Sequence, residues 1–126
     1  MAQIKTVALW KGTKVGALGT AGTILSDIID LRDVDPYPTA FSMSYAIAST
    51  NGTAGEGTAG SSVFELLGCA TRDGSYVSLG TFGTFGNGPA QSGFISLSPT
   101  LAPCMKAKAV TGTSNPAVLT SELHMS

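Results

Sequence analysis

The segment Ser62–Phe82, SVFELLGCATRDGSYVSLGTF, decides the fold that we predict for this chain. Two apolar-rich runs, Val63–Ala70 and Tyr76–Phe82, flank the polar turn Thr71–Ser75, which contains an Asp-Gly pair. Asp-Gly between two such runs is a strong hairpin signal, because glycine adopts positive φ at little cost and aspartate tolerates it. We therefore predict a central antiparallel hairpin, with the other strands packed around it.

Thr39–Ser49 gives the clearest further strand signal, because large apolar and small side chains alternate along it. Weaker strand patterns cover Thr6–Trp10, Gly93–Ser98, Cys104–Val110 and Ala117–Met125. The sequence thus predicts an all-β fold, a single antiparallel β-sandwich of jelly-roll type with about eight strands. It spans residues 1–126, with a short N-terminal arm at residues 1–6.

The period-2 pattern also predicts which side chains fill the core between the sheets. The expected core residues are Phe41, Met43, Tyr45, Ile47, Phe64, Leu66, Val77, Leu79, Ile95, Leu97, Leu119 and Leu123. Thr23–Asp35 is ambiguous between a helix and a strand, and its alternation and isoleucine content favour a strand. Its four aspartates lack the spacing and glycine of a calcium loop, which favours a solvated strand face or turn.

The composition limits the classes of function. The 126 residues suit one domain, only 12% are charged, and seven basic against eight acidic residues leave none in excess to neutralise a phosphate backbone. The segment between Lys5 and Lys11 is too short for a secretory signal, and no apolar run approaches the ~18 residues of a membrane span. We therefore expect no nucleic-acid or membrane partner. A surface so poor in charge fits either an assembly subunit or a small neutral domain, and composition leaves both open.

Catalytic and metal-binding motifs are not found in the sequence. His124 is the single histidine and is expected to be an exposed terminal side chain, and no serine lies in a Gly-x-Ser-x-Gly motif. The glycines of Lys11–Gly22 do not complete a phosphate-binding loop, so a turn or hairpin is expected there. Cys69 and Cys104 are predicted to be buried free thiols, and a disulfide stays open if their strands are neighbours. We predict no enzyme activity, no cofactor and no metal.

The second half of the chain resembles a known family. An Asp73-Gly74 hairpin precedes a glycine-rich loop, the connection Ser98–Pro103 and a strand bearing Lys106 and Lys108. A Thr-Gly-Thr turn at 111–113 and a last strand beginning at residue 117 follow. This pattern, over residues 62–123, resembles small β-sandwich virion proteins of tailed bacteriophages, the capsid cement or decoration proteins.

The resemblance implies a non-enzymatic structural protein. Such a protein is made in the host cytoplasm, binds the outer surface of the major capsid lattice in the virion, stabilises it, and forms homo-oligomers. The alternative is a tail-fibre or head-fibre module that binds a receptor or carbohydrate. For that role the candidate loop aromatics are Tyr37, Phe82 and Phe85.

Two segments are candidates for the interaction surface. The arm buries too little to order itself alone, so we expect it to pair with the capsid or a neighbouring copy, most simply within a trimer. The second candidate is the flat face of the Thr39–Ser49 strand. The predicted interaction residues are Ala2, Gln3, Ile4, Lys5, Thr6, Ser42, Ser44 and Ala46.

Overall fold

The computed structural model describes residues 5–15, 21–33, 40–48, 62–85, 91–98, 102–111 and 117–125. Within these ranges the chain forms nine strands and one 3-10 turn, Leu31–Asp33. The strands are β1 (Lys5–Val15), β2 (Gly22–Leu25), β3 (Ile29–Asp30), β4 (Phe41–Ala48), β5 (Ser62–Cys69), β6 (Val77–Phe85), β7 (Gln91–Leu97), β8 (Cys104–Thr111) and β9 (Ala117–Met125).

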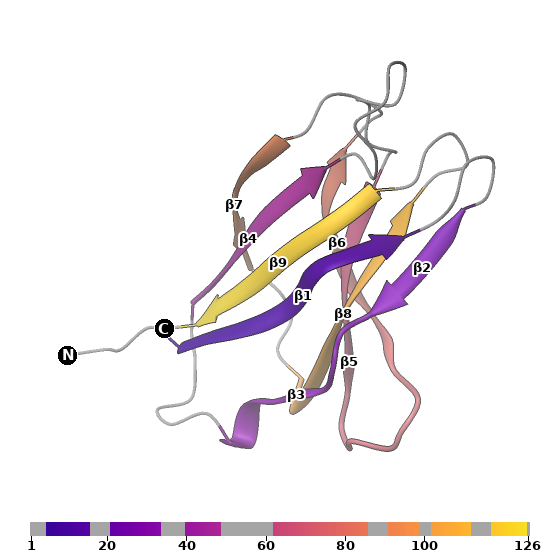
Figure 1. Ribbon diagram of the computed structural model, residues 1–126. Helices are drawn as coiled ribbons and strands as arrows, with labels where there is room; N and C mark the ends of the chain where they lie inside the picture. Colours follow the sequence, from indigo (N-terminus) through magenta and orange to yellow (C-terminus); the bar gives the residue numbers. More distant parts are fainter. Residues whose placement is uncertain are drawn as a thin grey trace, which may run out of the picture.

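The strands form two antiparallel sheets. One sheet has the order β1-β9-β4-β7, and the other has the order β2-β8-β5-β6 with β3 also beside β8. Figure 1 shows β7, β4, β9 and β1 side by side in one layer, with β6, β5 and β8 in the layer behind them. Because β2 and β3 pair with opposite ends of β8, they occupy one strand position, which leaves four positions in each sheet. This is the jelly-roll arrangement, and the predicted antiparallel β-sandwich is confirmed.

Ser26 explains why β2 and β3 are separate. Its backbone N–H donates to the carbonyl of Ala107 at 2.8 Å, and its hydroxyl accepts from the Ala107 N–H at 2.9 Å. The serine side chain therefore takes over one ladder hydrogen bond while the backbone turns away from β8. The predicted strand over Thr23–Asp35 is thus present as two short pieces followed by the 3-10 turn.

The hairpin β5–β6 is confirmed, but the reason for glycine in its turn differs from the expected one. Gly74 does not have positive φ, since among the described residues only Gly12 and Gly80 do. A Cβ atom on Gly74 would instead collide with the sulfur of Cys69. The turn needs glycine at this position because it passes very close over that side chain.

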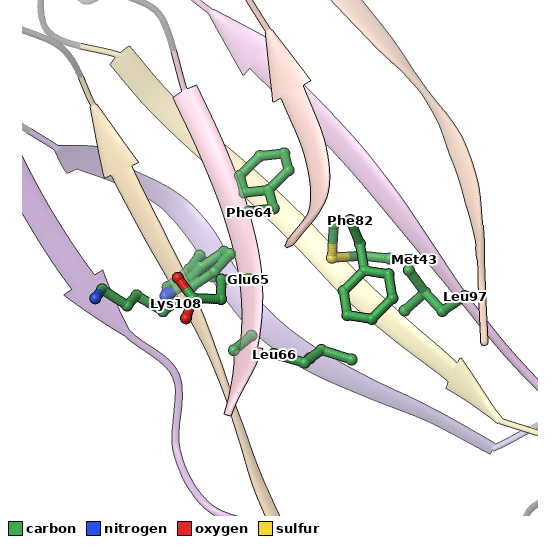
Figure 2. Close-up of a pocket in the computed structure, with 9 residues that line it drawn as sticks. Met43, Phe64, Glu65, Leu66, Phe82, Leu97 and Lys108 are labelled. Carbon is green, nitrogen blue, oxygen red and sulfur yellow. The ribbon is translucent and has the colours of Figure 1, made fainter. Parts of the chain in front are cut away.

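The core lies between the two sheets and joins them through aromatic contacts. Trp10 of β1 stacks on Phe64 of β5 with ring centroids 6.1 Å apart, and Tyr45 of β4 lies 6.3 Å from the same ring. Figure 2 shows Met43 and Phe82 close together beside β5, in a space lined also by Trp10 and Leu97 that has no room for a water molecule. This space is packed core and not a ligand pocket.

Most of the predicted core is buried, with one error. Tyr45, Leu79 and Ile95 are only partly buried, and Val77 is 62% exposed. Val77 pairs with Gly68 at the end of the edge strand β6, where it lines an open groove rather than the interior. Buried apolar residues that the prediction omitted are Leu9, Trp10, Val15, Ile29, Leu31, Met105, Ala107, Ala109, Ala117 and Met125.

Strand β1 is longer than predicted at both ends. Lys5 pairs with Met125 and Thr6 with His124, so these two residues belong to the sheet and not to a free arm. Lys11–Val15 continue the strand where a turn was expected, with Gly12 at φ +60° in an irregular stretch of the pairing. Glycine adopts that conformation easily. The strand β1 can therefore bulge here and still pair with β9 before and after the bulge.

Candidate functional site

The outer face of the four-stranded sheet, called here the bare face, carries mostly small polar side chains. Directly opposite residues of antiparallel strands point to the same side of the sheet, and the register therefore defines this face across β1, β9, β4 and β7. Glu122 is its single carboxylate among the described residues. Lys14, at the end of β1, is opposite Val118 on the same side and is exposed. The bare face consists of Thr6, Ala8, Lys14, Ser42, Ser44, Ala46, Ser92, Phe94, Ser96, Val118, Thr120, Glu122 and His124.

Phe94 is the most exposed large apolar side chain of the described residues. It is 78% exposed, lies opposite Ser44 on the edge strand β7, and has exposed Ser92 and Ser96 on either side along the strand. Its ring is 6.2 Å from the imidazole of His124, at an interplanar angle of 45°. This exposed aromatic side chain on an otherwise small-residue face is a candidate anchor for a contact, because aromatic residues are enriched among the residues that dominate binding energy.

His124 connects three strands of the bare face. Its Nδ1 lies 3.0 Å from the hydroxyl of Thr6 on β1, and its Nε2 lies 3.2 Å from the hydroxyl of Ser44 on β4. The expectation of a merely exposed terminal histidine is therefore wrong, because the ring is half-buried and bonded through both nitrogens. These bonds hold the ring in place beside Phe94.

The Ser44–His124 pair invites comparison with a catalytic dyad, but its surroundings differ. A serine hydrolase orients the histidine with a buried carboxylate, which stabilises the imidazolium that forms. Here the second ring nitrogen faces the neutral hydroxyl of Thr6. The pair is better suited to rigidifying the bare face than to activating a nucleophile.

The predicted interaction residues fall into three groups. Ser42, Ser44 and Ala46 lie on the bare face, as expected, and are half-buried among their neighbours. Thr6 is on the same face and meets Ser44 through His124, whereas Lys5 is simply the first residue of β1. Ala2, Gln3 and Ile4 lie outside the described residues.

Of the aromatic candidates from the sequence, only the Phe82 side chain is described, and it is not part of the bare face. Phe82 packs against the core, and Tyr37 and the side chain of Phe85 lie outside what the structure describes. Phe94 was missed because aromatic residues were sought in loops. Its signal was present in the sequence, since inward Ile95 and Leu97 place Phe94 outward on the same strand.

A charged cluster lies at one end of the five-stranded sheet, around Asp30. Two nitrogens of Arg32 donate to the Asp30 carboxylate at 2.9 and 2.8 Å, and Arg72 approaches it to 3.7 Å. The Arg32 side-chain hydrogen bonds lower the pKa of Asp30 to about 2, and the charge of Arg72 acts in the same direction. The Asp30 side chain is only 8% exposed, so the predicted solvated carboxylate is instead a buried, paired one.

In the described ranges, no three or more His, Cys, Asp or Glu side chains gather as a metal site. Those ranges also contain no helix that is long and apolar enough to cross a membrane.

No protein-family model matches the chain, and no characterised protein matches its sequence. Similar solved structures include a chain of infectious bursal disease virus, Gx strain, at 12% identity and a TM-score of 0.49, covering 98% of this chain and 31% of that one. The CBM36-1 domain of a multidomain xylanase from the hindgut metagenome of Trinervitermes trinervoides is 8% identical, with a TM-score of 0.46 and coverage of 97% and 96%.

A carbohydrate-binding module CBM36, solved with calcium and xylotriose, is 16% identical, with a TM-score of 0.39 and coverage of 100% and 90%. This chain spans about a third of the viral chain and nearly the whole of each module. At these levels of identity the likeness concerns the fold alone.

Proposed function

We propose that the protein is a non-enzymatic structural subunit of a bacteriophage virion, a decoration or cement protein that binds the outside of the major capsid lattice. The observation that carries this proposal is the bare face, an outer sheet face with one carboxylate, one lysine and the exposed ring of Phe94. The resemblance of residues 62–123 to capsid decoration proteins suggests that the partner is a major capsid protein.

The physical chemistry of the bare face suits association. Interface centres are depleted in charge and enriched in aromatic anchors, because desolvating ions is costly and burying rings is favourable. Full burial of one phenylalanine contributes about 1.5–3 kcal/mol. Contacts of that size are weak singly, but they are repeated across a symmetric shell and add up when the subunit is multivalent.

The N-terminal arm is the second contact that we propose. Ala2–Ile4 precede β1, which is an edge strand of the four-stranded sheet. Edge strands and the segments that continue them readily add to a neighbouring sheet through backbone hydrogen bonds. We propose that this arm contacts the capsid or an adjacent copy, and that the subunit is a homotrimer.

A deletion tests the arm without harming the sheet. Removing Ala2–Ile4 spares Lys5 and Thr6, which pair with β9. The truncated protein is expected to keep its unfolding midpoint and to bind empty capsids less tightly. Unchanged binding would confine the capsid contact to the bare face, and light scattering of the same samples checks the trimer.

A second candidate function is favoured by the surroundings of Phe94. An exposed ring flanked by the hydroxyls of Ser92 and Ser96, with His124 nearby, is also a platform on which a sugar ring can stack and hydrogen-bond. In that case the protein is a receptor-binding or carbohydrate-binding module of a phage fibre.

Co-sedimentation separates the two candidates. The full chain is mixed either with empty capsids of the same virus or with beads carrying host-surface glycans. Saturable pelleting with capsids and none with glycan beads supports the decoration role. The reverse pattern would replace it with the fibre role.

A further inference from the structure

The two cysteines lie directly opposite each other on neighbouring strands. Cys69 of β5 pairs in register with Cys104 of β8, so both side chains point to the outer side of the five-stranded sheet. Both are free thiols in the structure. Directly opposite residues in an antiparallel pair have Cα atoms about 4.5 or about 5.5 Å apart. Disulfides span about 4.4–6.8 Å, so the backbone is already placed for a bond.

The two sulfurs differ in access. Cys69 is half-buried and lines an open groove of about 480 Å³, whose walls include Val77, Leu79 and Pro103. Cys104 is fully buried, and Nη2 of Arg32 lies 3.5 Å from its sulfur. We therefore expect a small molecule to react with Cys69 first, because Cys104 is fully buried beside the Arg32 guanidinium.

The groups around the thiols hold the pair in place. Gly74 passes so close over the Cys69 sulfur that no side chain fits there. The hydroxyl of Tyr76 donates to the carbonyl of Arg72 at 3.0 Å, and the Lys106 ammonium lies 4.3 Å from the Tyr76 ring centre. Burial raises the pKa of the Tyr76 hydroxyl.

We propose that Cys69 and Cys104 form a redox-sensitive modification site that closes to an intramolecular disulfide by exchange with a small-molecule disulfide, such as oxidised glutathione. The Cys69 thiolate attacks one sulfur of the reagent, which forms a mixed disulfide and releases one glutathione thiolate. The Cys104 thiolate then attacks the Cys69 sulfur and expels the second. The two protein thiols are oxidised, the reagent is reduced to two thiols, and the two cysteine protons pass through solvent to the products.

The cysteine pair gives the protein a reduced and an oxidised state that share one backbone arrangement. In a reducing compartment the pair stays open, and in an oxidising one it closes. The bond links the ends of β5 and β8 and encloses the intervening chain, including β6 and β7. Constraining that loop in the unfolded chain stabilises the native state.

The test uses the purified full chain, incubated without denaturant in oxidised or reduced glutathione and then trapped with N-ethylmaleimide. Trypsin places Cys69 in the peptide 33–72 and Cys104 in the peptide 73–106. The expected result with oxidised glutathione is a monomer that has lost two hydrogens and yields these two peptides linked. Its thermal midpoint rises, and dithiothreitol reverses the change.

Single variants test the order of the steps. Cys104→Ser is expected to accumulate the glutathione adduct on Cys69, because the resolving thiol is gone. Cys69→Ser is expected to react much more slowly, because Cys104 is buried. The proposal is overturned if the natural chain stops at the mixed disulfide, forms disulfide-linked dimers, or links the peptides only after unfolding. Equal reaction rates for the two variants would overturn the order.

Discussion

The outer faces of the two sheets differ in charge, although the same jelly-roll backbone builds both. The bare face carries hydroxyls, exposed Phe94 and two charged side chains, Glu122 and Lys14. The outer face of the five-stranded sheet places Glu65 opposite Lys108, puts Lys106 over Tyr76, and surrounds Asp30 with arginines. Covering the second face would desolvate many ions, whereas covering the bare face would desolvate few. On the proposed function, the four-stranded sheet is therefore the side that we expect to contact a partner.

The largest expected loss of stability comes from the core that the two sheets share. Phe64→Ala should lower the free energy of unfolding by about 3–5 kcal/mol, because Phe64 is 2% exposed and joins the sheets through Trp10 and Tyr45. The matched variant is the next residue, Glu65→Ala, which points outward and should change it by less than about 0.5 kcal/mol. Urea denaturation measures both. Similar losses in the two variants would show that the inward–outward assignment of β5 is wrong.

The next effect concerns the charged face. Asp30→Asn should destabilise the protein at neutral pH, because Arg32 and Arg72 then lose their carboxylate partner. The pKa of Asp30 is about 2 in the folded protein, against an ordinary value of 3.8. A lowered folded pKa gives stability that is fully present above the unfolded value and is lost as the pH falls through the folded one.

The pH profile therefore has a defined shape. The stability difference between the natural chain and Asp30→Asn should be constant above about pH 5, narrow between pH 4 and 2, and vanish below. Thermal melts across this range measure it. A difference that is independent of pH would mean that the carboxylate charge does not contribute.

The smallest effect concerns the bare face itself. Ser44→Ala removes the hydroxyl bonded to Nε2 of His124 and should cost about 0.5–1.5 kcal/mol. Ser96→Ala, on the same face but exposed, is the control and should be neutral. Urea denaturation of both variants gives the comparison. Equal values would mean that the Thr6–His124–Ser44 bonds do not order this face.

Alternation along the strands made much of the fold predictable. The hairpin β5–β6, the inward residues of β4 and the outward lysines of β8 follow from period 2, because a buried sheet face permits one register. The bulges of β1 and β6 do not follow from it. The bulge of β1 brings both Leu9 and Trp10 inward, and the edge position of β6 leaves Val77 exposed.

The site was predictable only where it depends on one strand. The alternation of their own strand predicted that Ser42, Ser44 and Ala46 share one face, and the register agrees. The contact of Thr6 with His124, the pairing of Asp30 with Arg72, and the register of Cys69 with Cys104 join segments far apart in the sequence. Such neighbours depend on strand order, which local patterns do not encode.

The most direct test of the central proposal compares two exposed apolar residues on opposite sheets. Phe94 on the bare face is 78% exposed, and Val77 on the five-stranded sheet is 62% exposed. Both are replaced by serine, and the affinity of each folded variant for empty capsids is measured by co-sedimentation. We predict that Phe94→Ser weakens binding at least about tenfold, equivalent to about 1.4 kcal/mol, while Val77→Ser binds as the natural chain does. Unchanged binding by Phe94→Ser, or a loss confined to Val77→Ser, would contradict the assignment of the bare face as the capsid contact.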